Sequence, residues 1–392
     1  MIVAFLNLGH AQKRKGIDLS NHTLDLDVEL ENRYFMEDPS FDGQNNYFPS
    51  VALRPRYTFE WNADDTSLNV EGFVRFDRDK ERTHFDFREF YFLKVKRNWE
   101  LSIGLKKVFW GVTESNHLVD IINQTDAIES FDGEEKLGQP LLQFSINTRQ
   151  GTLDFFYLPY HRKRTLPGEK GRFRFPIIVS TNNVLYESAA KEWHQDIAIR
   201  YSNSFNSLDL GVSYFYGTGR EPLLQLSSEV GIRAIYPIIH QVGLDLQITK
   251  NAFMWKLESI YRSGKLQRVM ALTAGLEYTV SNIKSLGVDI GLICEYLFDD
   301  RNEFALNALQ NDIFVGSRIA FNDVQDTSIL LGVISDLGKS SKIIGVEASR
   351  RIGSTMKLEL EGRFFSSIAE DETFLSNFRN DSFIGLTIMK YF

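Results

Sequence analysis

The sequence has few of the residues that build disulfides, metal sites or catalytic centres. Its single cysteine, Cys294, excludes both an intrachain disulfide and a cysteine-based metal site. The seven histidines are scattered without a pair at metal-binding spacing, and no serine lies in a glycine elbow. The net charge is −8, so no basic excess supplies the positive surface that binds nucleic acid. We therefore expect no enzyme, no cofactor, no metal and no nucleic-acid partner.

Long apolar runs are also missing. No stretch of about eighteen consecutive apolar residues occurs, which excludes a transmembrane helix. A transmembrane β-strand exposes only every second side chain to lipid, so the slightly polar mean hydropathy of −0.23 is compatible with a barrel. Proline is limited to nine residues, whereas 31 Phe and 15 Tyr bring the aromatic content to 13%. This composition is typical of a strand-rich protein with aromatic belts.

Alternation of apolar and polar residues predicts eighteen strands, with sixteen as the nearest alternative. Residues 51–62 place Val51 and Tyr57 on one wholly apolar face, and Arg54 and Arg56 on the opposite, charged face. A strand of about eleven residues with this pattern is long enough to cross a bilayer at the usual tilt. The expected strands are 22–35, 51–62, 68–76, 85–95, 99–109, 141–149, 152–158, 196–202, 208–216, 241–249, 253–262, 269–280, 286–297, 313–321, 328–334, 342–350, 356–365 and 383–392.

The connections between these strands alternate in length. Tight turns such as 96–98 and 250–252 follow every second strand, and most of the other joins are long, such as 110–140 and 159–192. Short periplasmic turns opposite long external loops are typical of outer-membrane barrels. We therefore expect an all-β fold: one transmembrane antiparallel up-and-down β-barrel covering residues 12–392, in the outer membrane.

Residues 110–140 interrupt the strand pattern and are expected to fold inward as a constriction loop. They carry seven carboxylates against Lys136, and also many apolar side chains that need a wall to pack against. Rings of opposed charge set selectivity in pores. A solvated external lip is the alternative, and carboxylate density leaves a calcium site within residues 126–135 open. The expected pore-lining and constriction residues are Arg54, Arg56, Arg75, Arg88, Lys94, Lys106, Trp110, Asp120, Asp126, Glu129 and Asp132.

Three further segments carry predictions about targeting and partners. Residues 1–11 are expected to be the remainder of a signal peptide. The final strand, 383–392, ends in Phe392 and resembles the strand by which the barrel assembly machinery recognises its substrates. In the 159–192 loop, residues 160–174 carry six cations against Glu169, so an external loop there could bind lipopolysaccharide phosphates or steer anions. A solvated lip is equally compatible with these charges.

Three sequence motifs resemble a family of porin-like Gram-negative outer-membrane proteins of unknown function. They are residues 88–93 (REFYFL), 104–111 (GLKKVFWG) and 120–126 (DIINQTD), where the family reads approximately REAY, GRQxxxWG and D-x-IN-P-x-D. Gln124 replaces the usual proline, and Lys107 replaces a glutamine. The resemblance covers roughly residues 85–140 and implies a barrel that serves as an export or uptake channel.

The function expected from these features is passive passage of small polar or charged solutes across the outer membrane. One alternative is a conduit for hydrophobic cargo that works with an inner-membrane exporter. The other is a structural subunit of a larger assembly or oligomer, with its bore plugged by the 110–140 loop. The hydrophobic conduit is favoured by aromatic residues expected on the lumen side, which are Phe73, Phe90, Phe92, Phe215, Phe314 and Phe365.

Overall fold

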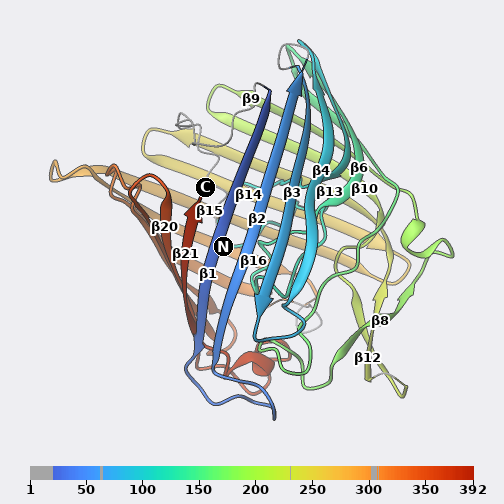
Figure 1. The fold of residues 1–392 in the computed structure, drawn as a ribbon, viewed down its shortest axis with the longest axis vertical. Helices are drawn as coiled ribbons and strands as arrows, with labels where there is room; N and C mark the ends of the chain where they lie inside the picture. The colour runs from blue at the N-terminus through green and yellow to red at the C-terminus, as the bar shows by residue number, and fades with distance from the viewer. Residues whose placement is uncertain (1–20, 62–64, 230, 302–306, 308) are drawn as a thin grey trace.

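The chain forms a closed β-barrel. A computed structural model describes residues 21–61, 65–229, 231–301, 307 and 309–392. Within them, eighteen strands form one sheet in which all neighbours are antiparallel, and β1 (His22–Phe35) pairs with both β2 (Tyr47–Trp61) and β21 (Phe383–Tyr391). That double pairing closes the ring (Figure 1). The prediction of an eighteen-stranded all-β barrel is confirmed, and the expected signal peptide lies outside the described residues.

The remaining barrel strands follow one another along the chain. They are β3 (Thr66–Asp77), β4 (His84–Val95), β5 (Trp99–Lys106), β6 (Gln139–Thr148), β7 (Gly151–Leu158), β9 (Asp196–Phe205), β10 (Leu208–Thr218), β13 (Ile238–Lys250), β14 (Phe253–Gly264), β15 (Arg268–Ile283), β16 (Val288–Asp299), β17 (Asn311–Ala320), β18 (Ser328–Asp336), β19 (Lys342–Ile352) and β20 (Met356–Ser366).

Two long loops contain a second, small sheet that the sequence analysis did not predict. It joins β8 (Val179–Tyr186), β11 (Leu223–Ser227) and β12 (Gly231–Tyr236), with β12 parallel to β8. The sheet lies at the long-loop end of the barrel (Figure 1). Its strands are short and were hidden in segments expected to be loops. Among the described residues, no helix is long and apolar enough to span a membrane.

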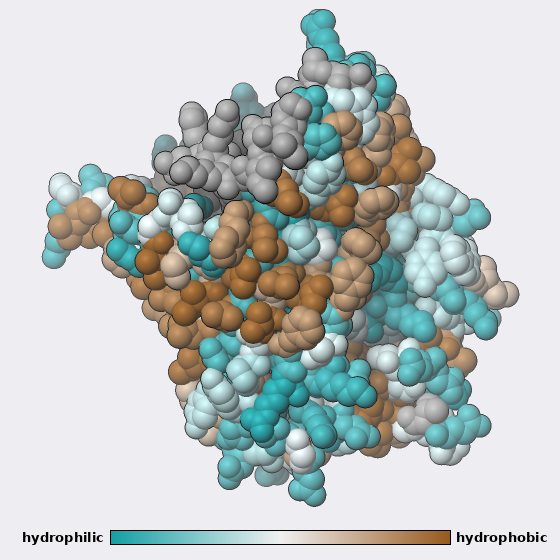
Figure 2. All heavy atoms as spheres, viewed as in Figure 1, coloured by the Kyte–Doolittle hydropathy of each residue, from teal (hydrophilic) through white to brown (hydrophobic). Residues whose placement is uncertain are grey.

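The period-two pattern separates an apolar outer surface from a charged interior. On β2, Val51 and Pro55 are exposed to the outside, whereas Ala52 is fully buried. Figure 2 shows apolar residues gathered in a band across the middle of one face, with hydrophilic residues concentrated at the long-loop end. Alternation along a strand places every second side chain on the same face, so the sequence pattern alone produces this separation.

A β-bulge in β4 reverses this alternation partway along the strand. The β3–β4 register shifts between Glu71 and Gly72, and Arg88 is the extra residue on β4. Arg88 is buried, whereas Phe90 is 53% exposed on the outer surface. The prediction that Phe90 and Phe92 face the lumen is therefore wrong. Lys94 follows them on the same outward face, so its expected place in the lumen is also wrong, because an inserted residue exchanges the two faces.

Candidate functional site

Residues 107–138, which join β5 to β6, fold into the barrel interior. Trp110, Val119, Ile121 and Ile122 are all at most 5% exposed. They pack against inward-facing residues of β6, β7, β9, β10, β13, β14 and β15, namely Leu141, Phe156, Leu158, Ala198, Phe215, Ile239, Ile260, Val269 and Ala271. Full burial of one such side chain contributes about 1.5–3 kcal/mol. This interior loop is therefore part of the barrel core, as the inward-folding prediction required.

Two carboxylates on the wall opposite β5 hold the interior loop in place. Glu258 of β14, which is fully buried, accepts hydrogen bonds from the backbone N–H groups of Val112 (2.7 Å), Thr113 (3.0 Å) and Val119 (3.1 Å). Glu295 of β16 accepts from the backbone N–H groups of residues 114 and 115, both at 2.8 Å. An irregular loop has no ladder partners for its N–H groups, so these carboxylates satisfy donors that would otherwise be buried unpaired.

The base of the interior loop is held by Asn123, within the 120–126 motif. Its side-chain oxygen accepts from the N–H of Val108 (2.8 Å), and its amide nitrogen donates to the carbonyl oxygens of Lys106 (2.9 Å) and Leu137 (2.8 Å). A Cβ at Gly138 would lie 2.1 Å from the carbonyl oxygen of Arg88, so only glycine fits there. The motif residues thus connect the outgoing and returning ends of the loop.

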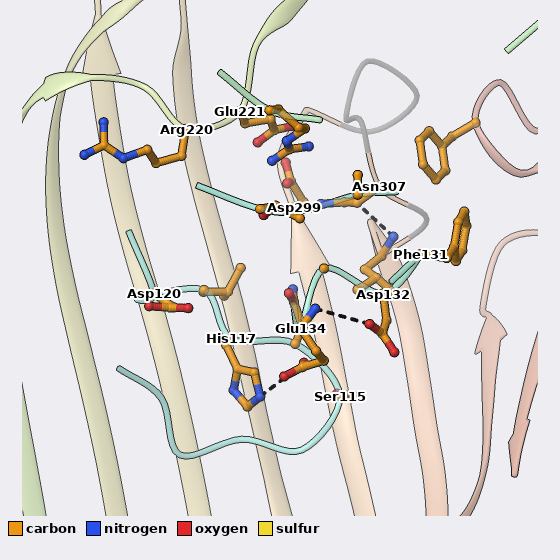
Figure 3. Close-up of a pocket in the computed structure, with 18 of the residues that line it drawn as sticks. Ser115, His117, Asp120, Phe131, Asp132, Glu134, Arg220, Glu221, Asp299 and Asn307 are labelled. Carbon is orange, nitrogen blue, oxygen red and sulfur yellow. Dashed lines mark hydrogen bonds and ion pairs between the residues drawn. The ribbon is translucent and has the colours of Figure 1, made fainter. Parts of the chain in front are cut away.

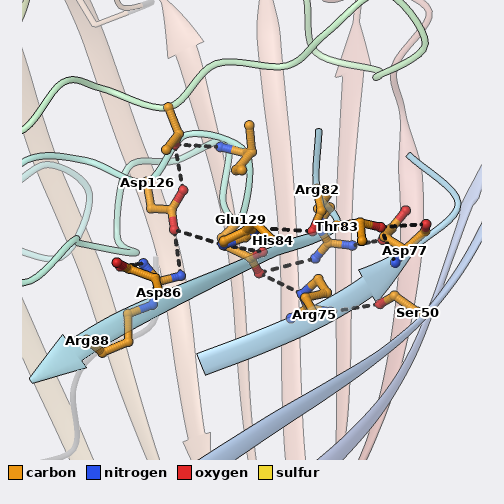
Figure 4. Close-up of polar contacts among 12 residues, drawn as sticks. Ser50, Arg75, Asp77, Arg82, Thr83, His84, Asp86, Arg88, Asp126 and Glu129 are labelled. Carbon is orange, nitrogen blue, oxygen red and sulfur yellow. Dashed lines mark hydrogen bonds and ion pairs between the residues drawn. The ribbon is translucent and has the colours of Figure 1, made fainter. Parts of the chain in front are cut away.

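A ladder of buried ion pairs joins the interior loop to β1, β3 and β4. Figure 4 shows the contacts of Glu129 with Arg75 and of Asp126 with Arg88. Arg75 pairs with Glu129 of the loop (2.9 Å) and with Glu31 of β1 (2.6 Å). Arg88 pairs with Asp126 of the loop at 2.6 Å, and its guanidinium lies 4.5 Å from the ring centre of Phe73. Arg75, Arg88, Asp126 and Glu129 are all less than 5% exposed. The structure therefore brings four of the expected constriction residues into direct contact.

Other expected constriction residues have different partners. Arg54 pairs with Glu29 and Arg56 with Asp27, both at 2.6 Å, so the acids of β1 rather than the loop carboxylates neutralise them. Lys106 donates to Ser102 and Gln143, both at 3.0 Å. The charges of Arg54 and Arg56 were expected to face the acidic loop. Instead they are satisfied within the wall, because the neighbouring strand presents a partner at the same height.

The remaining expected residues lie on the interior loop itself. Trp110 packs edge-on against Phe156 and lies under Arg200, whose guanidinium is 5.1 Å from its ring centre. Asp120 pairs with Lys136 inside the loop at 3.3 Å. Asp132 pairs with Arg363 of β20 at 2.7 Å. The loop starts at β5 and thus reaches across the barrel interior to β20.

The basic segment 160–174 packs against the interior loop instead of forming an exposed external lip. Arg172 is 4% exposed, pairs with Asp381 at 2.6 Å and lies over the ring of Phe35. Arg162 pairs with Asp86 at 2.8 Å, and Thr165 donates a hydrogen bond to Asp126 at 2.5 Å. Of the six cations, Lys163 and Lys170 are exposed. The arrangement of six cations as one external basic surface is therefore a wrong expectation.

A chamber of about 350 Å³ remains beside the interior loop, within the barrel. Figure 3 shows Arg220, Glu221 and Asp299 together on one side, and Phe131 on another. Glu221 bridges Arg301 (2.8 Å) and Arg262 (3.3 Å) on the charged side. The aromatic side is formed by Phe131, Phe173, Phe175, Phe374 and Phe378. The chamber is therefore amphipathic, with compensated charges facing an apolar wall.

Among the titratable loop groups around the chamber that have shifted pKa values are His117 and Glu221. Burial lowers the pKa of His117, but the carboxylates of Glu258 and Glu134 outweigh it and raise that pKa above its ordinary value of 6.5. Burial raises the pKa of Glu221, but Arg301 and Arg262 outweigh it and bring the pKa down to about 2. The two carboxylates therefore favour the protonated form of His117, and the two guanidinium groups favour the ionised form of Glu221.

The structure identifies site residues that the sequence analysis did not select. Alternation along their strands places Glu258 and Glu295 on the inner face, but nothing in the sequence indicated which backbone groups they would bind. Glu221 and Arg301 lie in loops without periodicity and gave no signal. Among the described residues, no group of three or more His, Cys, Asp or Glu is arranged to hold a metal ion.

Comparison with known proteins relates this geometry to porins. No protein-family model and no curated protein sequence matches the chain. Similar solved structures include a BenF-like porin from Pseudomonas fluorescens Pf-5 (10% identity, TM-score 0.55, covering 95% of this chain and 97% of that one). Pseudomonas aeruginosa OpdQ gives 10% identity, a TM-score of 0.56 and coverage of 95% and 96%. Pseudomonas aeruginosa OccK3 gives 9%, 0.54, 94% and 95%. At these identities the likeness shows the fold alone, which is similar to that of porin barrels.

Proposed function

We propose that the protein is an outer-membrane channel through which small polar or charged solutes pass passively. The observation that carries the proposal is a closed eighteen-stranded barrel whose interior loop leaves a chamber of about 350 Å³ bordered by charged residues. Barrels of about this strand number enclose an aqueous bore. Charged side chains such as Arg262 and Arg318 on the inner faces have ionic partners there, so the interior around the chamber is polar.

Conductance across a planar lipid bilayer tests this proposal. The purified protein should produce stable ohmic steps. Replacement of residues 112–136 by a short flexible linker should enlarge those steps, because the segment fills much of the interior. Slower migration after boiling, which distinguishes folded barrels on gels, serves as the folding control. Silence from both folded proteins would contradict the channel and favour a plugged structural subunit.

Passage of hydrophobic cargo is the second candidate, and the aromatic side of the chamber favours it. Phe131 contacts Phe173, Phe374 and Phe378 with ring centres 4.7 to 6.4 Å apart. Such a surface binds apolar molecules without a polar partner. Phe374→Ser with Phe378→Ser should slow the passage of an apolar fluorescent dye into liposomes while ion conductance persists. If dye passage and ion conductance fell equally, the polar-solute channel would be the simpler account.

A further inference from the structure

The interior loop is fastened to the wall on both sides of β18 and β19. Glu114 forms an ion pair with Arg318 of β17, and lies 3.9 Å from Lys256 of β14. Asp132 pairs with Arg363 of β20 at 2.7 Å. In the sheet, β18 and β19 lie between β17 and β20. The loop therefore spans the inner face of β18 and β19, and its ion pairs lie on β17 and β20, the strands that flank this pair.

Where the interior loop spans β18 and β19, three glycines lie side by side on the inner face. Gly316 of β17 pairs with Gly332 of β18, and Gly332 pairs with Gly345 of β19. None of the three has a positive φ, so the backbone conformation does not require glycine at these positions. Glycine within a strand often indicates that something approaches the backbone closely. The reason for three adjacent glycines must therefore be the space above them.

Two of the glycines make room for one aromatic ring. A Cβ on Gly332 would lie 2.2 Å from Cε2 of Phe314, and a Cβ on Gly316 would lie 2.6 Å from Cζ of the same ring. The Phe314 side chain thus lies flat across both glycines, an arrangement that compensates for the missing side chains. Phe314 is consequently held against the wall and projects little into the bore.

Gly345 differs from the other two glycines. Among the residues that the structure describes, no atom would lie within 4 Å of a Cβ built on Gly345. Gly345, Gly332 and Phe314 all line the chamber. At Gly345 the inner face of β19 is therefore bare backbone that faces the chamber, which residues of the interior loop also line.

We propose that solutes permeate through the gap between the interior loop and this glycine-lined wall, and that Gly345 sets the width of the gap. The inference rests on the proposed channel function and specifies its route. The ion pairs Glu114–Arg318 and Asp132–Arg363 bound the gap on either side. The width of the gap at Gly345 therefore limits the size of the solutes that pass.

Gly345→Trp tests the route, because an indole at this position would fill the gap. We expect the single-channel conductance to fall by about fivefold or more, since pore dimensions limit the passage of hydrated ions. Ala348→Trp is the matched control: Ala348 pairs with Ile329 and Leu360 on the outer face of the same strand. Its conductance should equal that of the wild type. Both variants are checked for folding by heat-dependent gel migration.

A cysteine at the same position keeps the proposal testable if the tryptophan variant does not fold. In a Cys294→Ser background, a bulky thiol reagent added to the folded Gly345→Cys protein should reduce the current in a single step, and Ala348→Cys should show no change. If the wild type conducts and neither Gly345→Trp nor labelling of Gly345→Cys lowers the current, the route is overturned and the channel function stands. A wild-type protein without current would overturn the channel itself, and the route with it.

Discussion

At the scale of single residues, buried carboxylates accept the backbone hydrogen bonds that a neighbouring strand would normally accept. Glu258 receives three backbone N–H groups and the hydroxyl of Thr113, which donates at 2.8 Å. Its position, in the middle of a strand on the inner face, is readable from alternation. Its role follows from the loop that reaches it across the barrel, 146 positions away from Val112 in the sequence.

Glu258→Ala should loosen the interior loop. Loss of the acceptor leaves buried N–H groups unpaired, at a cost of roughly 1–3 kcal/mol for each donor. We expect faster trypsin cleavage at Lys136 and noisier open-channel current. Glu258→Gln retains a side-chain oxygen for residues 112 and 113 and should have a much smaller effect. Indistinguishable cleavage rates for Glu258→Ala and the wild type would contradict the anchoring role.

His117 predicts a pH dependence of the loop attachment. It lies 3.7 Å from Glu258 and 3.4 Å from Glu134, and these acids raise its pKa although burial opposes them. A histidine whose pKa is raised by folding contributes stability that is fully present below pH 6.5 and is lost as pH rises through the raised value. We expect loop-related current noise to grow across that range, and His117→Gln to remove the change. An NMR titration that placed the His117 pKa below 6.5 would refute this.

At the scale of elements, the ion-pair ladder of β1 to β4 fixes one edge of the interior loop. Arg75 and Arg82 both pair with Glu31, and both lie near Glu129. The bulge in β4 places Arg88 in the same cluster, pointing at Asp126. A register change of one residue in β4 thus adds the Arg88–Asp126 pair to the contacts between the loop and this wall.

Arg75→Met should destabilise the barrel strongly. Removal of one partner from a buried ion-pair cluster costs about 3–5 kcal/mol, because the remaining carboxylates stay buried without compensation. Arg56→Met is the comparison, since Arg56 has Asp27 as its partner and its side chain is 29% exposed. Urea unfolding in lipid vesicles should show a clearly larger loss for Arg75→Met. Equal losses would mean that the ladder does not act as a unit.

At the scale of the whole molecule, the apolar outer surface implies that hydrocarbon surrounds the barrel. Val315, at the middle of β17, is 53% exposed on that surface. Val315→Arg should lower the folding free energy in vesicles by about 2–4 kcal/mol if the residue lies at the bilayer midplane. Ser349→Arg, on the inner face of β19 and paired with Glu359, should be tolerated. Similar effects of both substitutions would argue against a lipid-facing outer surface.

The sequence by itself determined the wall of this protein. A strand in contact with lipid on one side and water on the other must alternate with period two, and that pattern survives in the sequence whatever the partners are. Strand number, the antiparallel order and the inward loop were therefore predictable. The β4 bulge was not predictable, because the strand has residue types compatible with either face whether or not one extra residue is inserted. Phe90, Phe92 and Lys94 were assigned to the wrong face for this reason.

Only the tertiary structure decided which charge meets which. The interior loop has no repeating pattern, so its contacts with Glu258, Glu295 and Arg363 depend on where the closed ring brings distant strands. Arg54 and Arg56 found partners on β1 because an adjacent strand is closer than any loop. The chamber beside Gly345 likewise exists only once the interior loop and the barrel wall are both folded. A cavity is a property of packing and not of any single segment.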